Sequence, residues 1–310
     1  MGTSAGIPSF TRNHPSIAIE YFGKSYFLYL FDCGENTQLQ LMKAGISFMK
    51  IDSIFITHWH ADHFAGLIPL IQTMNMEGRE KELKIFAPDA EKYLYHIQSL
   101  YAYKPKFEII PINVELSEEP IKIYENEVLE FYSIAVKHTV KSVAFALKEK
   151  DKFSIDEKKL EQLNLKRGRW LEEIKKKGFY KFKDGREIKL EDIAFLKKGI
   201  KITYSGDCVY DENLAKLAKD SKVLIHEATY LEEDKEAEKY HSSSLDAAKI
   251  AKLSNVEMLV LTHISRRYQS KEDLEKILNE AKSVFPNTII AEDFLTIEIL
   301  RDNIKIFKRI

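Results

Sequence analysis

At residues 57–63 the chain reads Thr57-His58-Trp59-His60-Ala61-Asp62-His63, which places four potential metal ligands within six residues. The stretch follows the apolar run Ile54–Ile56 and precedes an apolar segment with helical spacing. In a strand, the side chains of His58 and His60 point to the same face, and the turn that follows brings Asp62 and His63 in from a second direction. Imidazole and carboxylate suit zinc, iron and manganese. The pattern predicts a metal site where a strand gives way to a helix.

Other short apolar runs also end in a residue able to do chemistry. Phe131–Val136 runs into His138, Ile200–Tyr204 into Asp207, Val223–Ile225 into His226-Glu227, and Met258–Leu261 into His263. Near-continuous apolar runs are typical of strands covered on both faces. Helical patterns lie between them, at Thr37–Ala44, Phe64–Met76, Ala90–Ala102, Ser244–Lys252 and Lys271–Val284. This α/β mixture predicts two sheets with helices outside and functional groups at strand ends.

The distribution of histidine and cysteine supports the same site. Seven of the nine histidines fall at these strand ends, in the loops that follow them or in the segment His241-Ser242-Ser243, and His14 and His96 are predicted to be ordinary surface or helix histidines. Cys33 and Cys208 are far apart and lack C-x-x-C spacing. We therefore expect neither a disulfide framework nor a thiolate zinc site.

The composition is that of a folded globular protein. The 310 residues are 45% hydrophobic and 31% charged, and suffice for one large or two modest domains. No run approaches the roughly 18 apolar residues that span a bilayer, and the N-terminus lacks a signal pattern. The sequence thus predicts a cytoplasmic protein with no membrane association.

Residues 148–199 differ from the remainder and are expected to form an insertion in a single 1–310 domain. They contain a hairpin signal at Lys183-Asp184-Gly185-Arg186. Residues 166–201 hold 13 Lys and Arg against 6 Asp and Glu, a net charge of +7, whereas the whole chain sums to −1. A basic module on an acidic body suits a polyanion, although a solvated charged hairpin explains the charge equally well.

The strand-end ligands together predict a site for two metal ions. One ion would be held by His58, His60 and His138, the other by Asp62, His63 and His263, with Asp207 as a bridge. Two ions roughly 3.5–4 Å apart can activate a shared water and stabilise both the attacking and leaving oxygens of an in-line displacement. This predicts hydrolysis, with phosphodiesters as a natural substrate class.

These residues carry a family resemblance. The H-x-H-x-D-H stretch with His138, Asp207 and His263 resembles the metallo-β-lactamase superfamily, whose fold is an αββα sandwich. Over nearly the whole chain the sequence resembles ribonuclease Z, which trims the 3′ trailer from precursor tRNA. The matching segments are Gly2–Gly6 with Pro8 and Arg12-Asn13, Phe31–Glu35 with Thr37-Gln38, Ser205–Asp207, His226–Thr229, His241–Ser243, and Leu261–His263 with Ser265 and Arg267-Tyr268.

The resemblance implies roles for particular residues. Asp62 would be a metal ligand and the general base for the attacking water, and His241, oriented by Glu227, the acid serving the leaving 3′ oxygen. His226 would be structural. Two zinc ions per subunit are implied, with cleavage leaving a 3′-hydroxyl on the tRNA and a 5′-phosphate on the trailer.

The resemblance also implies that the basic insertion is an arm that grips tRNA and that the enzyme is a homodimer. The expected substrate-binding residues are Lys166, Arg167, Arg169, Lys175, Lys176 and Lys177. The chain departs from the family at Phe10, where lysine is common, and in Leu165–Trp170, which lacks the arm's usual Gly-Pro segment. It also starts at the Gly-Thr-Ser loop, so we expect a shortened start that leaves one sheet without a strand.

Other functions remain open on the sequence alone. A small-molecule phosphodiesterase, or another hydrolase of the same fold, could use the same ligands, but it has no need of a +7 extension. A catalytically silent RNA-binding subunit would be expected to lose ligands, whereas every expected position is filled. A thiol-ester or lactone hydrolase is possible, although no segment supplies a dedicated pocket for either.

Overall fold

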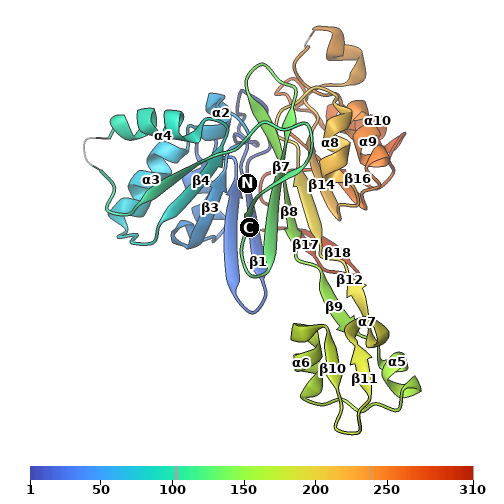
Figure 1. The fold of residues 1–310 in the computed structure, drawn as a ribbon. Coiled ribbons are helices and arrows are strands. Elements are labelled where there is room, and N and C mark those ends of the chain that lie inside the picture. The colour runs from blue at the N-terminus through green and yellow to red at the C-terminus, as the bar shows by residue number, and fades with distance from the viewer. Residues whose placement is uncertain (102–103, 238, 310) are drawn as a thin grey trace. The chain divides into compact units, whose positions relative to one another are not determined.

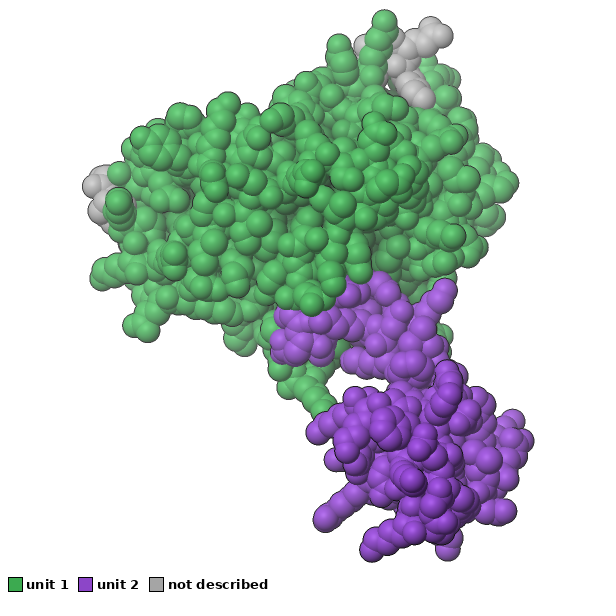
Figure 2. Space-filling view, in the orientation of Figure 1, with its two compact units in different colours: residues 1–125, 131–147, 201–310 green, residues 126–130, 148–200 purple. Residues whose placement is uncertain are grey.

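The computed structural model describes residues 1–101, 104–237 and 239–309, and the chain divides into two compact units (Figure 2). Unit 1 comprises residues 1–125, 131–147 and 201–310, and unit 2 comprises residues 126–130 and 148–200. Residues 148–199, predicted as an insertion, fall within unit 2. Their role as an RNA-binding arm stays a prediction.

Unit 1 contains two main sheets, of five and seven strands among the described residues. The first has the order β1 (Ile17–Phe22), β2 (Tyr26–Phe31), β3 (Ile51–Phe55), β4 (Leu83–Ala87), β5 (Ile109–Asn113). The second has the order β16 (Thr288–Ile290), β15 (Met258–Thr262), β14 (Val223–Glu227), β13 (Lys201–Tyr204), β8 (Ser142–Glu149), β7 (Leu129–Val136), β6 (Ile121–Glu125). A separate hairpin pairs β17 (Leu295–Ile299) with β18 (Ile304–Lys308). Strands β13 to β16 are parallel, as are β2 to β5.

Helices cover the outer face of each sheet, so the predicted αββα sandwich is confirmed (Figure 1). The helices of unit 1 are α1 (Thr37–Lys43), η1 (Phe48–Lys50), α2 (Ala61–Phe64), α3 (Leu67–Met76), α4 (Ala90–Ser99), α8 (Glu212–Ala218), η2 (Glu232–Ala237), α9 (Ser244–Leu253) and α10 (Lys271–Lys282). Helices α1, α3 and α4 bury apolar side chains against the first sheet, and α8, α9 and α10 do so against the second.

Aromatic rings fill the space between the two sheets. Phe55 on β3 lies 4.8 Å from Phe131 on β7 and 5.4 Å from Phe145 on β8, measured between ring centroids. Its neighbour Ile54 packs instead with the helices outside the first sheet, since successive side chains of a strand point to opposite faces. This alternation explains why the end of β3 carries apolar side chains toward both faces, at Ile54 and Phe55, just before the ligand-bearing segment.

The structure corrects several sequence expectations in unit 1. The helix expected at Phe64–Met76 is divided into α2 and α3, because the chain turns at Gly66, where a Cβ atom would lie 2.0 Å from Gly34 O. The end of the helix expected at Ala90–Ala102 lies outside the described residues. His14 is 8% exposed and not a surface residue, because Gly34 packs directly against its Cβ.

Unit 2 has a small core of its own. It contains β9 (Lys152–Ile155), α5 (Glu157–Gln162), α6 (Trp170–Lys177), β10 (Phe179–Lys181), β11 (Glu187–Lys189), α7 (Leu190–Ile193) and β12 (Ala194–Lys197). The predicted hairpin is confirmed, since β10 pairs with β11 across a turn in which Gly185 has φ +88°. The buried core consists of Leu160, Ile174, Leu190, Ile193 and Ala194.

Within residues 1–101, 104–237 and 239–309, no helix has the length and apolar character required to span a membrane.

Candidate active site

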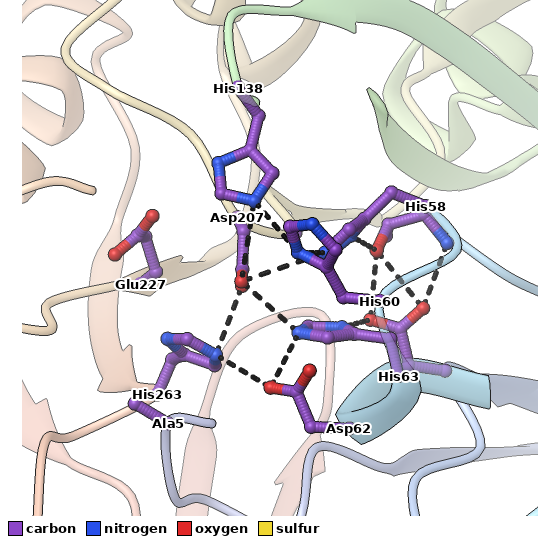
Figure 3. Close-up of polar contacts among 12 residues, drawn as sticks. Ala5, His58, His60, Asp62, His63, His138, Asp207, Glu227 and His263 are labelled. Carbon is purple, nitrogen blue, oxygen red and sulfur yellow. Dashed lines mark hydrogen bonds and ion pairs between the residues drawn. The ribbon is translucent and has the colours of Figure 1, made fainter. Parts of the chain in front are cut away.

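The predicted ligands come together at one edge of unit 1, where strands of both sheets end (Figure 3). His58 and His60 lie between β3 and α2, and His138 follows β7. Asp207 follows β13, and His263 follows β15. The parallel strands β13, β14 and β15 all present their carboxyl ends here, the usual place for a site on a parallel sheet. The backbone at Gly206, which has φ +60°, packs directly against Thr57. This close contact brings the segment that carries Asp207 next to the segment that carries His58.

Three histidines and Asp207 form the first group of potential ligands. Nδ1 of His60 lies 3.0 Å from Nε2 of His58 and 3.2 Å from Nε2 of His138. Oδ2 of Asp207 lies 3.7 Å from His58 Nε2 and 4.0 Å from His138 Nε2. One donor atom from each of the four lies within 4.8 Å of every other.

Asp207 belongs to a second group as well, with Asp62, His63 and His263. Its Oδ2 lies 3.2 Å from His63 Nε2, and its Oδ1 lies 3.2 Å from His263 Nε2. Oδ2 of Asp62 lies 3.4 Å from His63 Nε2 and 3.5 Å from His263 Nε2. A carboxylate shared between the groups is the arrangement that a bridging ligand requires.

The outer nitrogen of each ring fixes its tautomer. Nδ1 of His138 lies 2.9 Å from Tyr240 O, and Nδ1 of His63 lies 2.7 Å from Asp32 Oδ2. A carbonyl and a carboxylate only accept, so both nitrogens donate and leave Nε2 bare toward the site. The three remaining histidines contact hydroxyls: His58 Nδ1 lies 3.0 Å from Thr57 Oγ1, and His263 Nδ1 lies 2.9 Å from Thr229 Oγ1. The His60 ring is reversed, because its Nδ1 faces the site and its Nε2 lies 3.3 Å from Thr139 Oγ1.

Three buried atoms test whether a metal fits. Nε2 of His63, Nε2 of His263 and Oδ1 of Asp207 have no hydrogen-bond partner among the described residues, although leaving a buried polar atom unpaired is costly. All three lie together at the centre of the second group. Bare imidazole nitrogens and carboxylates form the donor set that zinc and its borderline neighbours prefer. The residues present therefore fit a metal at this position.

The pKa shifts agree with a cation site. Burial lowers the pKa of His58, His60 and His138, which keeps these rings neutral as ligands must be. At His63 the carboxylates of Asp207, Asp32 and Asp62 outweigh burial and raise the pKa well above its usual value. The second group thus carries surplus negative charge that a cation would balance.

Asp32 supports the site, although the sequence analysis assigned it no role. It is fully buried with φ +54°, and it accepts hydrogen bonds from Thr57 N at 2.8 Å and from the Tyr204 hydroxyl at 2.8 Å, besides its contact with His63. The sequence indicated Asp32 in the same way as Asp207, because both are acidic residues that come after an apolar strand, β2 for Asp32 and β13 for Asp207.

His241 and Glu227 form a pair beside the ligands. Nδ1 of His241 lies 3.0 Å from Oε1 of Glu227 and 3.9 Å from Oδ2 of Asp207. Burial lowers the pKa of His241, but the Glu227 carboxylate more than offsets this and raises the pKa to about 9. Glu227 is held in turn by Cys208 N at 2.7 Å and the Thr229 hydroxyl at 2.6 Å. His226, by contrast, turns its Nδ1 to Glu227 O and is buried outside the ligand groups.

These groups open into a cavity of about 540 Å³. Asp62, Asp207, His241 and His263 line it, and Arg266 and Arg267 add positive charge to its wall. The guanidinium of Arg267 lies 5.3 Å from the centre of the Tyr230 ring. The cavity can therefore bring an anionic ester against the buried ligand groups.

The predicted RNA-binding residues all lie in unit 2 and are exposed. Lys175, Lys176 and Lys177 form the last turn of α6, and Lys166, Arg167 and Arg169 precede this helix. Arg167 pairs with Glu157, and Lys177 pairs with Glu173 at 2.6 Å.

Comparisons with known proteins agree with this geometry. The β-lactamase superfamily domain matches residues 192–264, and the family of the anti-Pycsar protein Apyc1 matches residues 10–174. Ribonuclease Z of Methanocaldococcus jannaschii is 40% identical over 97% of this chain and 96% of its own, and that of Bacillus subtilis is 37% identical over 97% and 98%. The crystal structure of human tRNase Z, short form, aligns with a TM-score of 0.66 at 26% identity, covering 94% of this chain and 95% of that one.

The fold and the converging ligands define a metal-binding hydrolase of the metallo-β-lactamase superfamily. Within it, the chain belongs to the ribonuclease Z family.

Proposed function

We propose that this protein is a zinc-dependent endoribonuclease that removes the 3′ trailer from precursor tRNA. Family membership supports the substrate. The observation that carries the chemistry is the position of Asp207, whose carboxylate faces His58 and His138 on one side and His63 and His263 on the other. We further propose that the enzyme is a homodimer that works in the cytoplasm.

Two zinc ions would be held by the two ligand groups, with Asp207 shared. Bound there, zinc would lower the pKa of a water molecule and neutralise charge on the phosphodiester. Asp62 faces the cavity and accepts the proton of the attacking water. The products are a 3′-hydroxyl on the tRNA and a 5′-phosphate on the trailer, so the leaving group is the 3′ oxygen.

His241 supplies the proton that this leaving oxygen needs. It lines the same cavity as Asp62, and its pKa of about 9 keeps the ring protonated at neutral pH. Glu227 orients the ring and stabilises its charge. A base and an acid at opposite ends of one phosphodiester account for hydrolysis without a covalent intermediate.

Unit 2 is proposed to bind the tRNA away from the cut. Its exposed residues Lys166, Arg167, Arg169, Lys175, Lys176 and Lys177 would contact phosphates, which gives affinity without reading sequence.

The deciding experiment compares the zinc-loaded protein and Asp62→Ala on an end-labelled precursor tRNA with a 3′ trailer. We expect two zinc ions per chain by mass spectrometry and one cut near the discriminator base. Asp62→Ala should slow the cut at least about a thousandfold, because a base and a ligand are lost together, while tRNA affinity is retained. Full activity in this variant would remove Asp62 from the mechanism. Turnover of a small phosphodiester without cleavage of precursor tRNA would favour a small-molecule phosphodiesterase.

A further inference from the structure

A loop near the N-terminus forms one wall of the cavity. Ala5, Gly6 and Ile7 line it together with the ligands Asp62 and His263. We call residues 4–10 the rim loop. Its start at Ser4 and Ala5 is buried, whereas Gly6, Ile7 and Pro8 are exposed. A chain bound in this cavity therefore lies next to Gly6 and Ile7.

The base of the rim loop is bonded to the segment that carries a ligand. Ala5 N donates to Ile264 O at 3.0 Å, and Ile264 N donates to Thr3 O at 3.0 Å. Ile264 directly follows His263. The loop is therefore held in register with the metal-binding edge of the second sheet.

A buried carboxylate holds the same base from behind. Asp293 is 5% exposed and accepts from the Thr3 hydroxyl at 2.8 Å, from Asn13 N at 2.8 Å and from the Gln40 amide at 3.0 Å. Arg12, also buried, donates to Thr3 Oγ1 at 2.7 Å and to Ala291 O at 2.6 Å. This network fixes both ends of the loop, so its tip is presented from a rigid base.

The tip is a tight turn with Phe10 at its apex. Ser9 Oγ accepts from Thr11 N at 3.3 Å and from Arg12 N at 3.1 Å, and Ser9 N donates to Arg12 O at 2.9 Å. The Phe10 side chain is fully exposed, and within the described part of the chain no ring or cation lies against it. An aromatic ring that packs on nothing in its own chain is available to a ligand.

We propose that Phe10 stacks on a nucleobase beside the cleaved phosphodiester. Phe10 is three positions along the chain from Ile7 at the cavity wall, a reach of at most about 11 Å, which places the ring near the nucleotide next to the cut or the one after it. Every base offers a flat face to such a ring, and single-stranded RNA is bound in this way by exposed aromatic side chains. A ring on a fixed turn also loses little conformational freedom on binding. The inference rests on the proposed function, because it requires an RNA substrate.

A fluorescence experiment tests the contact directly. Full-length Asp62→Ala protein is mixed with precursor tRNA that carries 2-aminopurine at one nucleotide on either side of the cut, one position per substrate. We expect quenching at one of these positions, on the tRNA side or the trailer side, and loss of quenching when Phe10→Ala is added. Quenching that is absent at all positions, or unchanged by Phe10→Ala, would overturn the proposal. This readout needs binding only, so it stands even if cleavage of precursor tRNA fails.

Kinetics separate stacking from a structural effect. Phe10→Ala should lower kcat/KM on precursor tRNA about tenfold, through KM, since stacking of one base is worth ~1–3 kcal/mol. Phe10→Tyr should restore it and Phe10→Leu should not, while all three hydrolyse bis(p-nitrophenyl) phosphate at the parent rate. Equal rescue by Leu, or a changed oligomeric state in Phe10→Ala, would contradict stacking. Failure of the parent protein to cut precursor tRNA would instead remove the proposed function.

Discussion

The two units of this protein use charge in opposite ways. In unit 1 the functional groups are buried and held by one another, as with Asp207, which is 2% exposed among the imidazoles of His58, His63 and His263. In unit 2 the basic groups are exposed, and among the described residues Lys175 and Lys176 form no ion pair. One region therefore holds its charged groups in a fixed geometry, and the other presents its charges to solvent.

This contrast leads to different responses to substitution. A metal-binding site needs each donor atom at a set place, and its supporting residues hold the rings in one tautomer. Phosphate contacts from flexible lysines tolerate displacement but are weakened by salt. Substitutions in unit 1 should change rate or metal affinity by orders of magnitude, whereas those in unit 2 should act in small, salt-dependent steps.

The largest effect that sharpens the comparison is expected for His241→Ala. Loss of a general acid should lower kcat on precursor tRNA by about 10²–10⁴-fold. Hydrolysis of bis(p-nitrophenyl) phosphate should change little, because p-nitrophenolate leaves without a proton. A precursor tRNA with sulfur in place of the leaving 3′ oxygen should restore cleavage by the variant, since a thiolate also needs no proton.

His96→Ala serves as the matched control for this variant, because His96 is an exposed histidine on α4. It should behave as the parent on all three substrates. An equal loss by His241→Ala on the tRNA and the small diester would assign His241 to metal binding rather than to proton donation.

A smaller effect is expected from Asp32→Asn, which changes a residue that holds the predicted metal ligands in place but is not itself a ligand. Asp32 accepts from Thr57 N with one carboxylate oxygen and from His63 and Tyr204 with the other, whereas asparagine has one acceptor oxygen and no charge. His63 would lose the negatively charged partner that fixes its tautomer, so zinc affinity should fall by about 10–100-fold, measured by competition with a chelator. Tyr204→Phe keeps the Asp32 carboxylate and should lose less zinc affinity than Asp32→Asn. Equal losses in the two variants would make the Tyr204 hydroxyl, not the charge of Asp32, the important feature.

Asp32 also shows how far sequence can lead at this site. Ligands could be predicted because strand ends concentrate functional residues at one edge, and His58, Asp207 and His263 all follow apolar runs. A supporting carboxylate such as Asp32 also follows an apolar strand, but it belongs to no spacing motif like that of residues 58–63, so its role could not be recognised. The prediction that His14 is a surface residue was wrong, because its burial depends on packing against Gly34, which is distant in sequence. Long-range packing of this kind leaves no local pattern, which is also why the division between α2 and α3 was not predicted.

The smallest effect is expected in unit 2, from replacing Lys175, Lys176 and Lys177 together with Ala. If each contacts a phosphate, the slope of log affinity against log salt should flatten by about 2–3, since each contact contributes ~0.7–0.9. Binding of precursor tRNA at low salt should weaken roughly tenfold, with hydrolysis of a small phosphodiester unchanged. The matched control replaces Lys252, Lys276 and Lys282, exposed lysines on or beside α9 and α10 of unit 1, and removes the same charge. If the control flattens the slope equally, net charge alone governs binding and the basic turn of α6 has no special part in it.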